Sequence, residues 1–261
     1  MRITAIDRFI ETTIRAAGKS AKCNFGVVTT GKIKTGIHDI VTEADYECER
    51  IILKAIQQKY PQHNILSEEA GLLDKKSDYT WIVDPIDGTN NFAKHIPLFG
   101  IIITLAKGNQ VLHGAIYDPI HDEFFYAKYK QGSYCNKKRI QVSKQHNLDN
   151  MIVSISNIPQ RSDQAYFAEL RKKVALHTTY YKAYGSAAQV LSAVACGRID
   201  AWILGGAYPW DIAAGALLVT EAGGKITTLT NQPWHWPTNN QQIVVANPKL
   251  HHSIIKLINH L

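Results

Sequence analysis

Residues 81–92, with the sequence WIVDPIDGTNNF, place two carboxylates three positions apart directly after a short apolar run. The apolar run predicts a strand that ends at Asp84, and Pro85 and Gly88 predict a tight turn that brings Asp87 beside it. Two carboxylates in such a place repel each other and lose hydration, so a compensating charge is needed. Their hard oxygen ligands suit Mg²⁺, whereas the tetrapeptide alone is also compatible with a loop whose Asx turn caps the next helix.

The segment that follows the turn predicts an anion site. Gly88 and Thr89 lead into a short predicted helix, NNFAK, whose first amides have no intrahelical partners and can hold a phosphate. Cations beside such a helix start neutralise phosphoryl oxygens, stabilise the leaving oxygen and lower the pKa of a bound water. The stretch therefore indicates metal-assisted hydrolysis of a phosphate ester.

Three other segments bring acidic residues to junctions between predicted elements. ILSEEAG places Glu68 and Glu69 at the end of a short strand. GIHDIVTEAD brings Asp45 to a helix start, and YPWDIAAGALLVTEAGG puts Asp211 at the start of an apolar helix. Each segment alone has a simpler interpretation, as surface acids or as helix caps. Together they favour one acidic site assembled from separate parts of the chain.

Composition limits the partners and the compartment. A net charge of +7 and a pI near 9.1 suit an anionic partner, which could be a phosphorylated metabolite, a nucleic acid or an acidic membrane surface. The four cysteines are far apart and form no zinc motif, which predicts reduced thiols. Asp7 and Glu11 interrupt the apolar core that a secretory signal would need, and no apolar run approaches membrane-spanning length. We therefore expect a cytoplasmic protein without a membrane partner.

Helical and strand patterns alternate along the chain, which predicts a layered α/β or α+β architecture. The expected helices are an opening segment in which Ile3 to Ile14 recur at helical spacing, then 42–60, 163–175, 186–196 and 211–222, and a closing helix. The expected strands are 64–66, 81–83, 101–106, 111–117, 124–129, 151–155 and 201–204, with two more before the closing helix. A boundary near residue 145 separates an N-terminal half, 1–145, from a C-terminal half, 146–261. No Gly/Ser-rich linker marks it, so we expect the halves to pack as one unit.

The chain resembles the inositol monophosphatase family, a group of Mg²⁺-dependent, lithium-sensitive phosphatases. The resemblance is carried by DIVTEAD, SEEAG, WIVDPIDGTNNF, YDPIHDEFFYA, AYGSAAQVLSAVACGRIDAWI and WDIAAGALLVTEAGG, in this order across nearly the whole chain. DPIDGT followed much later by WDIAAG is a specific combination. The resemblance implies the layered αβαβα sandwich of the sugar phosphatases, an α+β fold, and a homodimer.

The resemblance also implies metal ligands, for two or three Mg²⁺ ions. Glu68, Asp84 and the backbone carbonyl of Ile86 would hold the first ion. Asp84, Asp87 and Asp211 would hold the second. Glu68 would contribute, through water, to a weaker third site.

Catalytic and phosphate-binding roles follow from the same matches. Thr89, hydrogen-bonded to Asp45, would orient and help deprotonate the metal-bound water, and Glu68 counts with them as a catalytic residue. The amides of Gly88 and Thr89 would hold the phosphate. Lys34 matches a family lysine that assists through its charge.

The resemblance implies that the alcohol part of the substrate contacts the two second-metal aspartates and one short segment. The substrate-binding residues implied are Asp87, Gly185, Ser186, Ala187, Leu204 and Asp211. In the animal inositol phosphatases the position of Leu204 is a glutamate that reaches a ring hydroxyl. Because leucine cannot make that hydrogen bond, we expect a broad or shifted choice among inositol, glycerol, sugar and histidinol phosphates.

Other functions remain open from the sequence. A 3'(2'),5'-bisphosphate nucleotidase or a fructose-1,6-bisphosphatase shares the DPxDGT motif, but the short segment SEEAGLLDKKSDYTWIVD resembles the monophosphatases more. A module that binds RNA or protein on the same fold would suit the basic charge, so a nucleic-acid partner is not excluded. Such a module has no physical reason to keep every acidic ligand together with Thr89. Nucleic-acid binding through phosphates would weaken steeply with salt.

Overall fold

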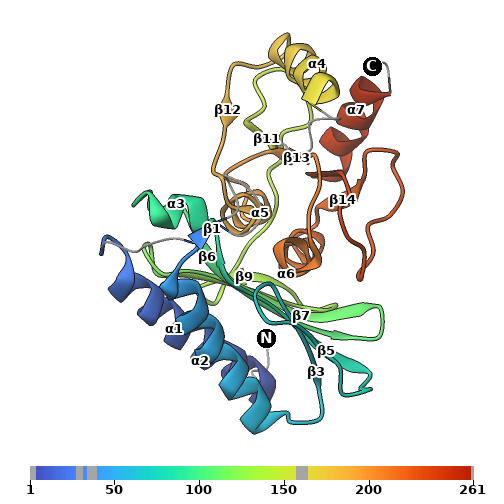
Figure 1. Ribbon diagram of the computed structural model, residues 1–261. Coiled ribbons are helices and arrows are strands. Elements are labelled where there is room, and N and C mark those ends of the chain that lie inside the picture. Colours follow the sequence, from blue (N-terminus) through green and yellow to red (C-terminus); the bar gives the residue numbers. More distant parts are fainter. Residues whose placement is uncertain (1–3, 28–31, 34–39, 157–163, 260–261) are drawn as a thin grey trace.

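Helices and sheets of this protein are stacked in layers (Figure 1). The computed structural model describes residues 4–27, 32–33, 40–156 and 164–259. The helices are α1 (Ala5–Asn24), α2 (Glu43–Lys59), α3 (Thr89–Ala93), α4 (Gln164–Ala175), α5 (Ala187–Ala195), α6 (Pro209–Glu221) and α7 (Pro248–Ile258).

The first sheet has eight strands in the order β10-β9-β8-β7-β6-β5-β3-β4. Its strands are β3 (Asn64–Ser67), β4 (Gly71–Leu73), β5 (Tyr79–Asp87), β6 (Gly100–Lys107), β7 (Gln110–Asp118), β8 (Glu123–Lys128), β9 (Gly132–Cys135) and β10 (Lys138–Arg139). Only β3 and β5 run parallel, and the other neighbours are antiparallel. This parallel pair carries two of the acidic segments to the same edge of the sheet.

The second sheet has five strands in the order β12-β11-β13-β15-β14. Its strands are β11 (Val153–Ser156), β12 (Tyr181–Lys182), β13 (Ala201–Leu204), β14 (Lys225–Thr228) and β15 (Ile243–Ala246). A separate two-stranded sheet pairs β1 (Lys32–Ile33) with β2 (Ile40–Val41).

The layers alternate as αβαβα. Helices α1 and α2 cover one face of the first sheet, and α5 and α6 lie between the two sheets (Figure 1). Helices α4 and α7 pack on the outer face of the second sheet. The predicted layered sandwich is therefore confirmed.

One hydrophobic core joins residues from before and after residue 145. Ile82 and Ile102 of the first sheet belong to the same buried cluster as Leu191 of α5 and Leu218 of α6. Most of α6 is apolar on every side because it lies between two sheets. The boundary near residue 145 stays a prediction.

Most of the expected elements are observed. Those predicted at 42–60, 64–66, 101–106, 111–117 and 201–204 are confirmed to within one residue at each end. The short strands β4, β9, β10 and β12 were not anticipated, because runs of two to four residues carry no alternating pattern and depend on pairing with a neighbour.

Capping residues determine where the first two helices begin. The Thr4 amide donates to Asp7 Oδ2 at 2.7 Å, and Asp7 lies three residues into α1. A capping box also begins α2, since the Thr42 amide donates to Asp45 Oδ2 at 2.8 Å. Ile3, which opened the predicted helical pattern, lies outside the described residues.

Gly114 of β7 lets α6 approach the sheet closely. A Cβ atom at this position would lie 2.7 Å from the carbonyl oxygen of Ala214 and 2.9 Å from its Cα. Both contacts are backbone atoms, so a larger residue must displace α6, which carries Asp211. Gly114→Ala is expected to lower the free energy of unfolding by about 1–3 kcal/mol. An unchanged midpoint in urea denaturation would contradict this packing.

Candidate active site

Three aspartates converge where β5 ends and α6 begins. Asp84, Asp87 and Asp211 each offer a carboxylate oxygen, and these oxygens all lie within 4.8 Å of one another. Asp84 is 1% exposed and Asp87 is 8% exposed. The predicted convergence of the DPID segment with the later Asp211 is therefore observed.

A β-bulge places the two aspartates of β5 together. The prediction that the strand ends at Asp84 was wrong, because β5 continues through Asp87. Asp84 pairs with Ile102 and Asp87 with Gly100, so β5 has one extra residue between the two pairs. Residues three apart on a regular strand point to opposite faces, and the extra residue returns them to the same side. Pro85 has no amide hydrogen to donate to a regular ladder here.

The cluster is electrostatically strained by its own charges. Burial, with the nearby charges of Glu68, Asp87 and Asp211, raises the pKa of Asp84 well above its ordinary value. Burial and the charge of Asp87 likewise raise the pKa of Asp211 well above its ordinary value. The buried Oδ1 atom of Asp84 has no hydrogen-bond partner. A buried carboxylate oxygen without a partner is costly, so this site is built to receive positive charge.

The parallel pairing of β3 with β5 brings Glu68 to the cluster. Ser67 pairs with Val83, and the Glu68 amide donates to the Val83 carbonyl at 3.2 Å. Glu68 therefore follows β3 at the level where Asp84 follows Val83 on β5. Its charge contributes to the raised pKa of Asp84, as expected for an acid that faces the same site.

Glu49 holds the turn that carries Glu68, and the sequence analysis did not identify it. Its Oε1 accepts a hydrogen bond from the Ser67 hydroxyl and another, at 3.0 Å, from the Ala70 amide. Glu49 is 8% exposed. Its spacing of four residues from Asp45 on α2 was the available signal, because such residues share one helix face.

Thr89 connects α3 to the start of α2. Its Oγ1 lies 3.0 Å from Asp45 Oδ1 and 2.9 Å from the Ile86 carbonyl oxygen. Asp45 is fully buried, and burial raises its pKa to about 6 against the opposing hydrogen bonds from Thr42 and Thr89. The predicted contact between Thr89 and Asp45 is therefore present.

The predicted substrate segment lies beside Asp87. The Ser186 hydroxyl donates to Asp87 Oδ2, and the Ala188 amide donates to the same oxygen at 2.7 Å. Gly185 has a φ of +65°, and a Cβ there would lie 3.1 Å from the side chain of Asn91. Ser186 therefore orients a carboxylate of the cluster with its hydroxyl.

Asn91 of α3 bonds to two other segments near this one, and the sequence analysis did not identify it. Its Nδ2 donates to the carbonyl oxygens of Leu98, at 2.7 Å, and Tyr184, at 2.5 Å. The contact with Tyr184 joins α3 to a segment ninety-three residues away in sequence, so no local pattern indicates it.

Leu204 and Lys34 are the two remaining predicted site residues. Leu204, at the end of β13, is 7% exposed and belongs to the buried cluster that also contains Ile82 and Leu191. It presents no polar atom to a substrate hydroxyl. Lys34 lies outside the described residues.

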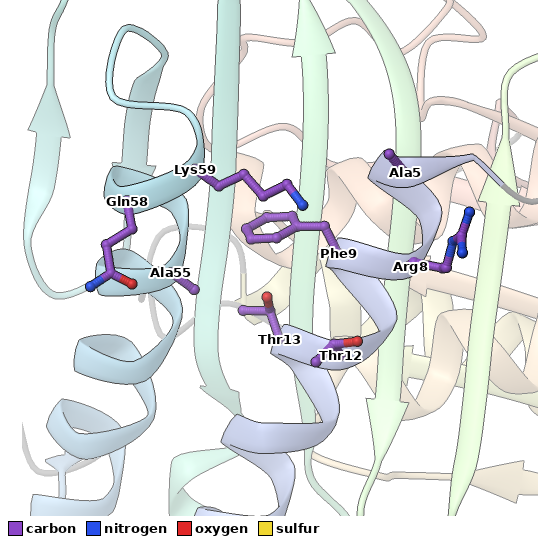
Figure 2. Close-up of a pocket in the computed structure, with 8 residues that line it drawn as sticks. All are labelled: Ala5, Arg8, Phe9, Thr12, Thr13, Ala55, Gln58 and Lys59. Atoms are coloured by element: carbon purple, nitrogen blue, oxygen red, sulfur yellow. The ribbon is translucent and has the colours of Figure 1, made fainter.

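A groove of about 710 Å³ lies between α1 and α2, apart from the aspartate cluster (Figure 2). Phe9 and Lys59 meet across it, with the Lys59 Nζ 5.7 Å from the centre of the Phe9 ring. Ala55 and Lys59 on its α2 side lie about 15–20 Å along the helix from Asp45. This groove contains none of the acidic ligands and is not the predicted site.

Comparison with known proteins agrees with this geometry. The model of the inositol monophosphatase family matches residues 3–261. The chain belongs to this family. It is 35% identical to the inositol-1-monophosphatase of Bacillus subtilis, over 97% of this chain and 96% of that protein. It is 33% identical to the fructose-1,6-bisphosphatase/inositol-1-monophosphatase of Thermotoga maritima, over 94% of this chain and 93% of that protein.

A solved structure of the inositol monophosphatase fold extends the likeness to three dimensions. The extragenic suppressor protein suhB from Bartonella henselae matches with a TM-score of 0.92 and 29% identity, covering 98% of each chain. The family resemblance is confirmed, and a phosphatase of this superfamily is supported. Among the described residues, no helix combines the length and apolar character needed to cross a membrane.

The donor set fits the Mg²⁺ on which inositol monophosphatases depend. Its ligands are carboxylate oxygens, which Mg²⁺ prefers, and no thiol or imidazole belongs to the three-aspartate group. The unpartnered oxygen of Asp84 gives a cation a buried ligand that no protein donor occupies.

Metal-free protein is expected to lose stability as pH rises from 5 to 8. A carboxyl whose folded pKa exceeds its unfolded value binds more protons when folded, so the free energy of unfolding falls with rising pH. The pKa of Asp45 is about 6 against an ordinary 3.8, so its ionisation lowers the free energy of unfolding between these pH values. The raised pKa values of Asp84 and Asp211 extend this loss to higher pH. Melting temperatures in EDTA test this, and Asp84→Asn should reduce the slope.

Added Mg²⁺ should reverse this loss at pH 8. At about 100 times its dissociation constant, a bound ion stabilises the folded state by about 2.7 kcal/mol, or about 5–10 °C for a chain of this size. A melting temperature that changes with neither pH nor Mg²⁺ would contradict the electrostatic account of the cluster.

Proposed function

We propose that this chain is a Mg²⁺-dependent phosphomonoesterase that hydrolyses inositol monophosphate or a related small polyol or sugar phosphate, of the inositol-phosphate phosphatase type. The observation that carries the proposal is the buried, unpartnered carboxylate oxygen of Asp84 within a group of three aspartates. A protein without a cation to bind would gain stability by replacing these residues.

Glu68, Asp84 and the carbonyl of Ile86 would hold one ion. Asp84, Asp87 and Asp211 would hold a second, and Glu68 would contribute to a third through water. When bound, Mg²⁺ neutralises phosphoryl oxygens and lowers the pKa of a water molecule.

Thr89 and Asp45 would accept the proton of the attacking water. The Thr89 hydroxyl accepts a hydrogen bond from that water while it donates its own hydrogen to Asp45 Oδ1, 3.0 Å away. The pKa of Asp45, raised by burial to about 6, suits a group that takes up a proton near neutral pH. Water attacks the phosphorus directly, so no covalent phosphoenzyme is needed.

The amides of Gly88 and Thr89 would hold the phosphate. Gly88 has a φ of +93°, and a Cβ there would lie 3.0 Å from the Leu98 carbonyl oxygen and 3.1 Å from Ser186 Cβ. Glycine is therefore needed for this backbone to turn from β5 into α3. The amides of this turn would supply the hydrogen bonds to the phosphate, because α3, with five residues, is too short to contribute through its helix dipole.

Choice among substrates should be broad. Leu204 offers no hydrogen bond to a ring hydroxyl, and sites that lack such a partner discriminate by only about 10- to 200-fold. We therefore expect kcat/KM for myo-inositol 1-phosphate to exceed kcat/KM for the other esters by no more than about a hundred-fold.

Phosphate release from a panel tests the activity and its range. The panel contains myo-inositol 1-phosphate, glycerol 2-phosphate, fructose 1,6-bisphosphate, histidinol phosphate and adenosine 3',5'-bisphosphate, each with and without Mg²⁺. Fructose 1,6-bisphosphate is the main alternative, because the name of the Thermotoga maritima relative includes its phosphatase. Turnover confined to the two bisphosphates would replace the monophosphatase proposal.

The family resemblance adds a homodimer and inhibition by lithium as predictions. Light scattering of the purified chain checks the first. Loss of Mg²⁺-dependent turnover in lithium chloride, with sodium chloride as the control, checks the second.

A further inference from the structure

The first turn of α5 holds one carboxylate of the aspartate cluster. Asp87 Oδ2 accepts hydrogen bonds from the Ser186 hydroxyl and, at 2.7 Å, from the Ala188 amide. Burial raises the pKa of Asp87, and these hydrogen bonds, with one from the Ala187 amide, oppose the increase. Asp87 is therefore held by the start of a helix as well as by its own strand, so a displaced helix turn would reorient the carboxylate.

Gln189 fixes this turn to the first sheet. Its Nε2 donates to the carbonyl oxygen of Phe99 and to Asp118 Oδ2, both at 2.8 Å. Its backbone amide donates at 3.2 Å to the Ser186 hydroxyl, which in turn donates to Asp87. Gln189 thus joins the residue before β6 and the end of β7 to the helix turn that holds Asp87.

Asp118 gives Gln189 a fixed partner. Its Oδ1 accepts from the amides of Ile120, at 2.9 Å, and His121, at 3.0 Å. Its Oδ2, which accepts from Gln189, also lies 2.8 Å from His121 Nδ1. Asp118 is 4% exposed. A buried carboxylate with these partners cannot follow a moving helix without losing hydrogen bonds, which is costly away from water.

Phe99 anchors Gln189 beside the strand pairing that carries Asp87. Gly100, the next residue, pairs with Asp87 between β6 and β5. A Cβ at Gly100 would lie 2.9 Å from Ala188 Cβ, so α5 approaches β6 closely at this point. Such apolar contact is not directional and allows a helix to slide along a sheet. The two hydrogen bonds of Gln189 are directional, so they determine where the turn lies.

The orientation of Asp87 matters because of the ion that the site suits. Mg²⁺ requires near-ideal octahedral geometry with oxygen ligands at about 2.0–2.1 Å, so a small displacement of one carboxylate lowers its affinity. Under the proposed function, on which this inference rests, Asp87 holds the second ion with Asp84 and Asp211. We propose that Gln189, anchored by Asp118, is a positioning residue that orients Asp87 toward this second ion.

Calorimetric titration of Mg²⁺ into EDTA-treated, dialysed protein tests the proposal without any substrate. Gln189→Met keeps the length of the side chain and removes both hydrogen bonds that the amide donates. Residues that orient metal ligands usually contribute about 10- to 100-fold in affinity, so the dissociation constant of the second ion should rise by about ten-fold. The Mg²⁺ concentration for half-maximal phosphate release should rise equally, with kcat at saturating Mg²⁺ within about two-fold of the wild type.

Gln189→Glu separates geometry from charge. Glutamate has the shape of glutamine but places a second carboxylate against Asp118, which repels it. An added negative charge near the cluster would by itself tighten the binding of a cation. Weaker Mg²⁺ binding by this variant would therefore come from a displaced helix turn. We expect its dissociation constant for the second ion to exceed that of the wild type, as in Gln189→Met.

Gln110→Met is the matched control. Gln110 begins β7, at the opposite end of the strand from Asp118, and its Nε2 donates to the Val111 carbonyl at 2.9 Å. This variant should bind Mg²⁺ as the wild type does. Melting temperatures in EDTA show whether each variant is folded. If Gln189 contributed to stability alone, its variants would melt at lower temperature and bind Mg²⁺ with unchanged affinity.

The outcomes distinguish this role from the proposed function. Wild-type protein that neither binds Mg²⁺ nor releases phosphate would overturn the phosphatase itself. Mg²⁺-dependent turnover in the wild type, with unchanged Mg²⁺ affinity in folded Gln189→Met and Gln189→Glu, would overturn only the positioning role. Equal weakening of Mg²⁺ binding in Gln110→Met would also overturn it.

Discussion

Asp84→Asn is expected to lower Mg²⁺-dependent phosphate release by at least about a thousand-fold in kcat/KM. Asp84 is the one aspartate proposed to contact both of the main ions, and its Oδ1 is buried without a protein partner. Asparagine keeps the shape of the side chain but removes its charge and replaces one acceptor oxygen with a donor. The variant should therefore lose the metal site and keep the fold.

Stability measurements distinguish this from misfolding. Removing one charge from a group of mutually repelling carboxylates should leave the melting temperature in EDTA at pH 8 unchanged or higher than that of the wild type. Asp74→Asn is the matched control, because Asp74 is an exposed acid paired with Lys76 at 2.6 Å, away from the cluster. Full activity in Asp84→Asn, or equal loss in Asp74→Asn, would contradict the assigned metal site.

Thr89→Ala is expected to lower kcat by about a hundred- to ten-thousand-fold, the usual contribution of a positioned proton-transfer group. The variant removes the hydroxyl that lies 3.0 Å from Asp45 Oδ1 while keeping every carboxylate. Mg²⁺ affinity, measured by calorimetry, should remain within about two-fold of the wild type. Thr89→Ser restores the hydroxyl and should recover most of the rate.

Asp45→Asn provides the second half of this test. If Thr89 and Asp45 act as one proton-transfer pair, the double variant should lose little more than either single variant. Losses that multiply would indicate independent roles. A Thr89→Ala variant that turns over normally would remove Thr89 from the mechanism.

The sequence indicated where several acidic residues lie because they follow strong local patterns. Asp84 follows the apolar residues of β5, Asp45 forms a capping box with Thr42, and Asp211 lies in the first turn of the apolar helix α6. Each pattern locates its carboxylate close to an element boundary, although β5 continues past Asp84 to Asp87. The family resemblance added that these positions meet in one site, and the structure brings Asp84, Asp87 and Asp211 together.

The supporting residues could not be read in the same way. Glu49 contacts a turn eighteen residues or more away, and Asn91 contacts Tyr184 across ninety-three residues. Their partners depend on which strands pair and which layers stack. The bulge between Asp84 and Asp87 is likewise defined by its register against β6. Pro85 indicates that the strand is irregular at this point, but the local sequence does not specify the register of β5 against β6.

The initial rate of phosphate release from myo-inositol 1-phosphate, measured as Mg²⁺ is titrated into EDTA-treated and then dialysed protein, tests the central claim most directly. The account predicts no measurable rate without the ion and a rate that rises to saturation as the aspartate cluster fills. A rate that does not depend on Mg²⁺ would contradict it. So would the absence of turnover at every Mg²⁺ concentration from folded protein.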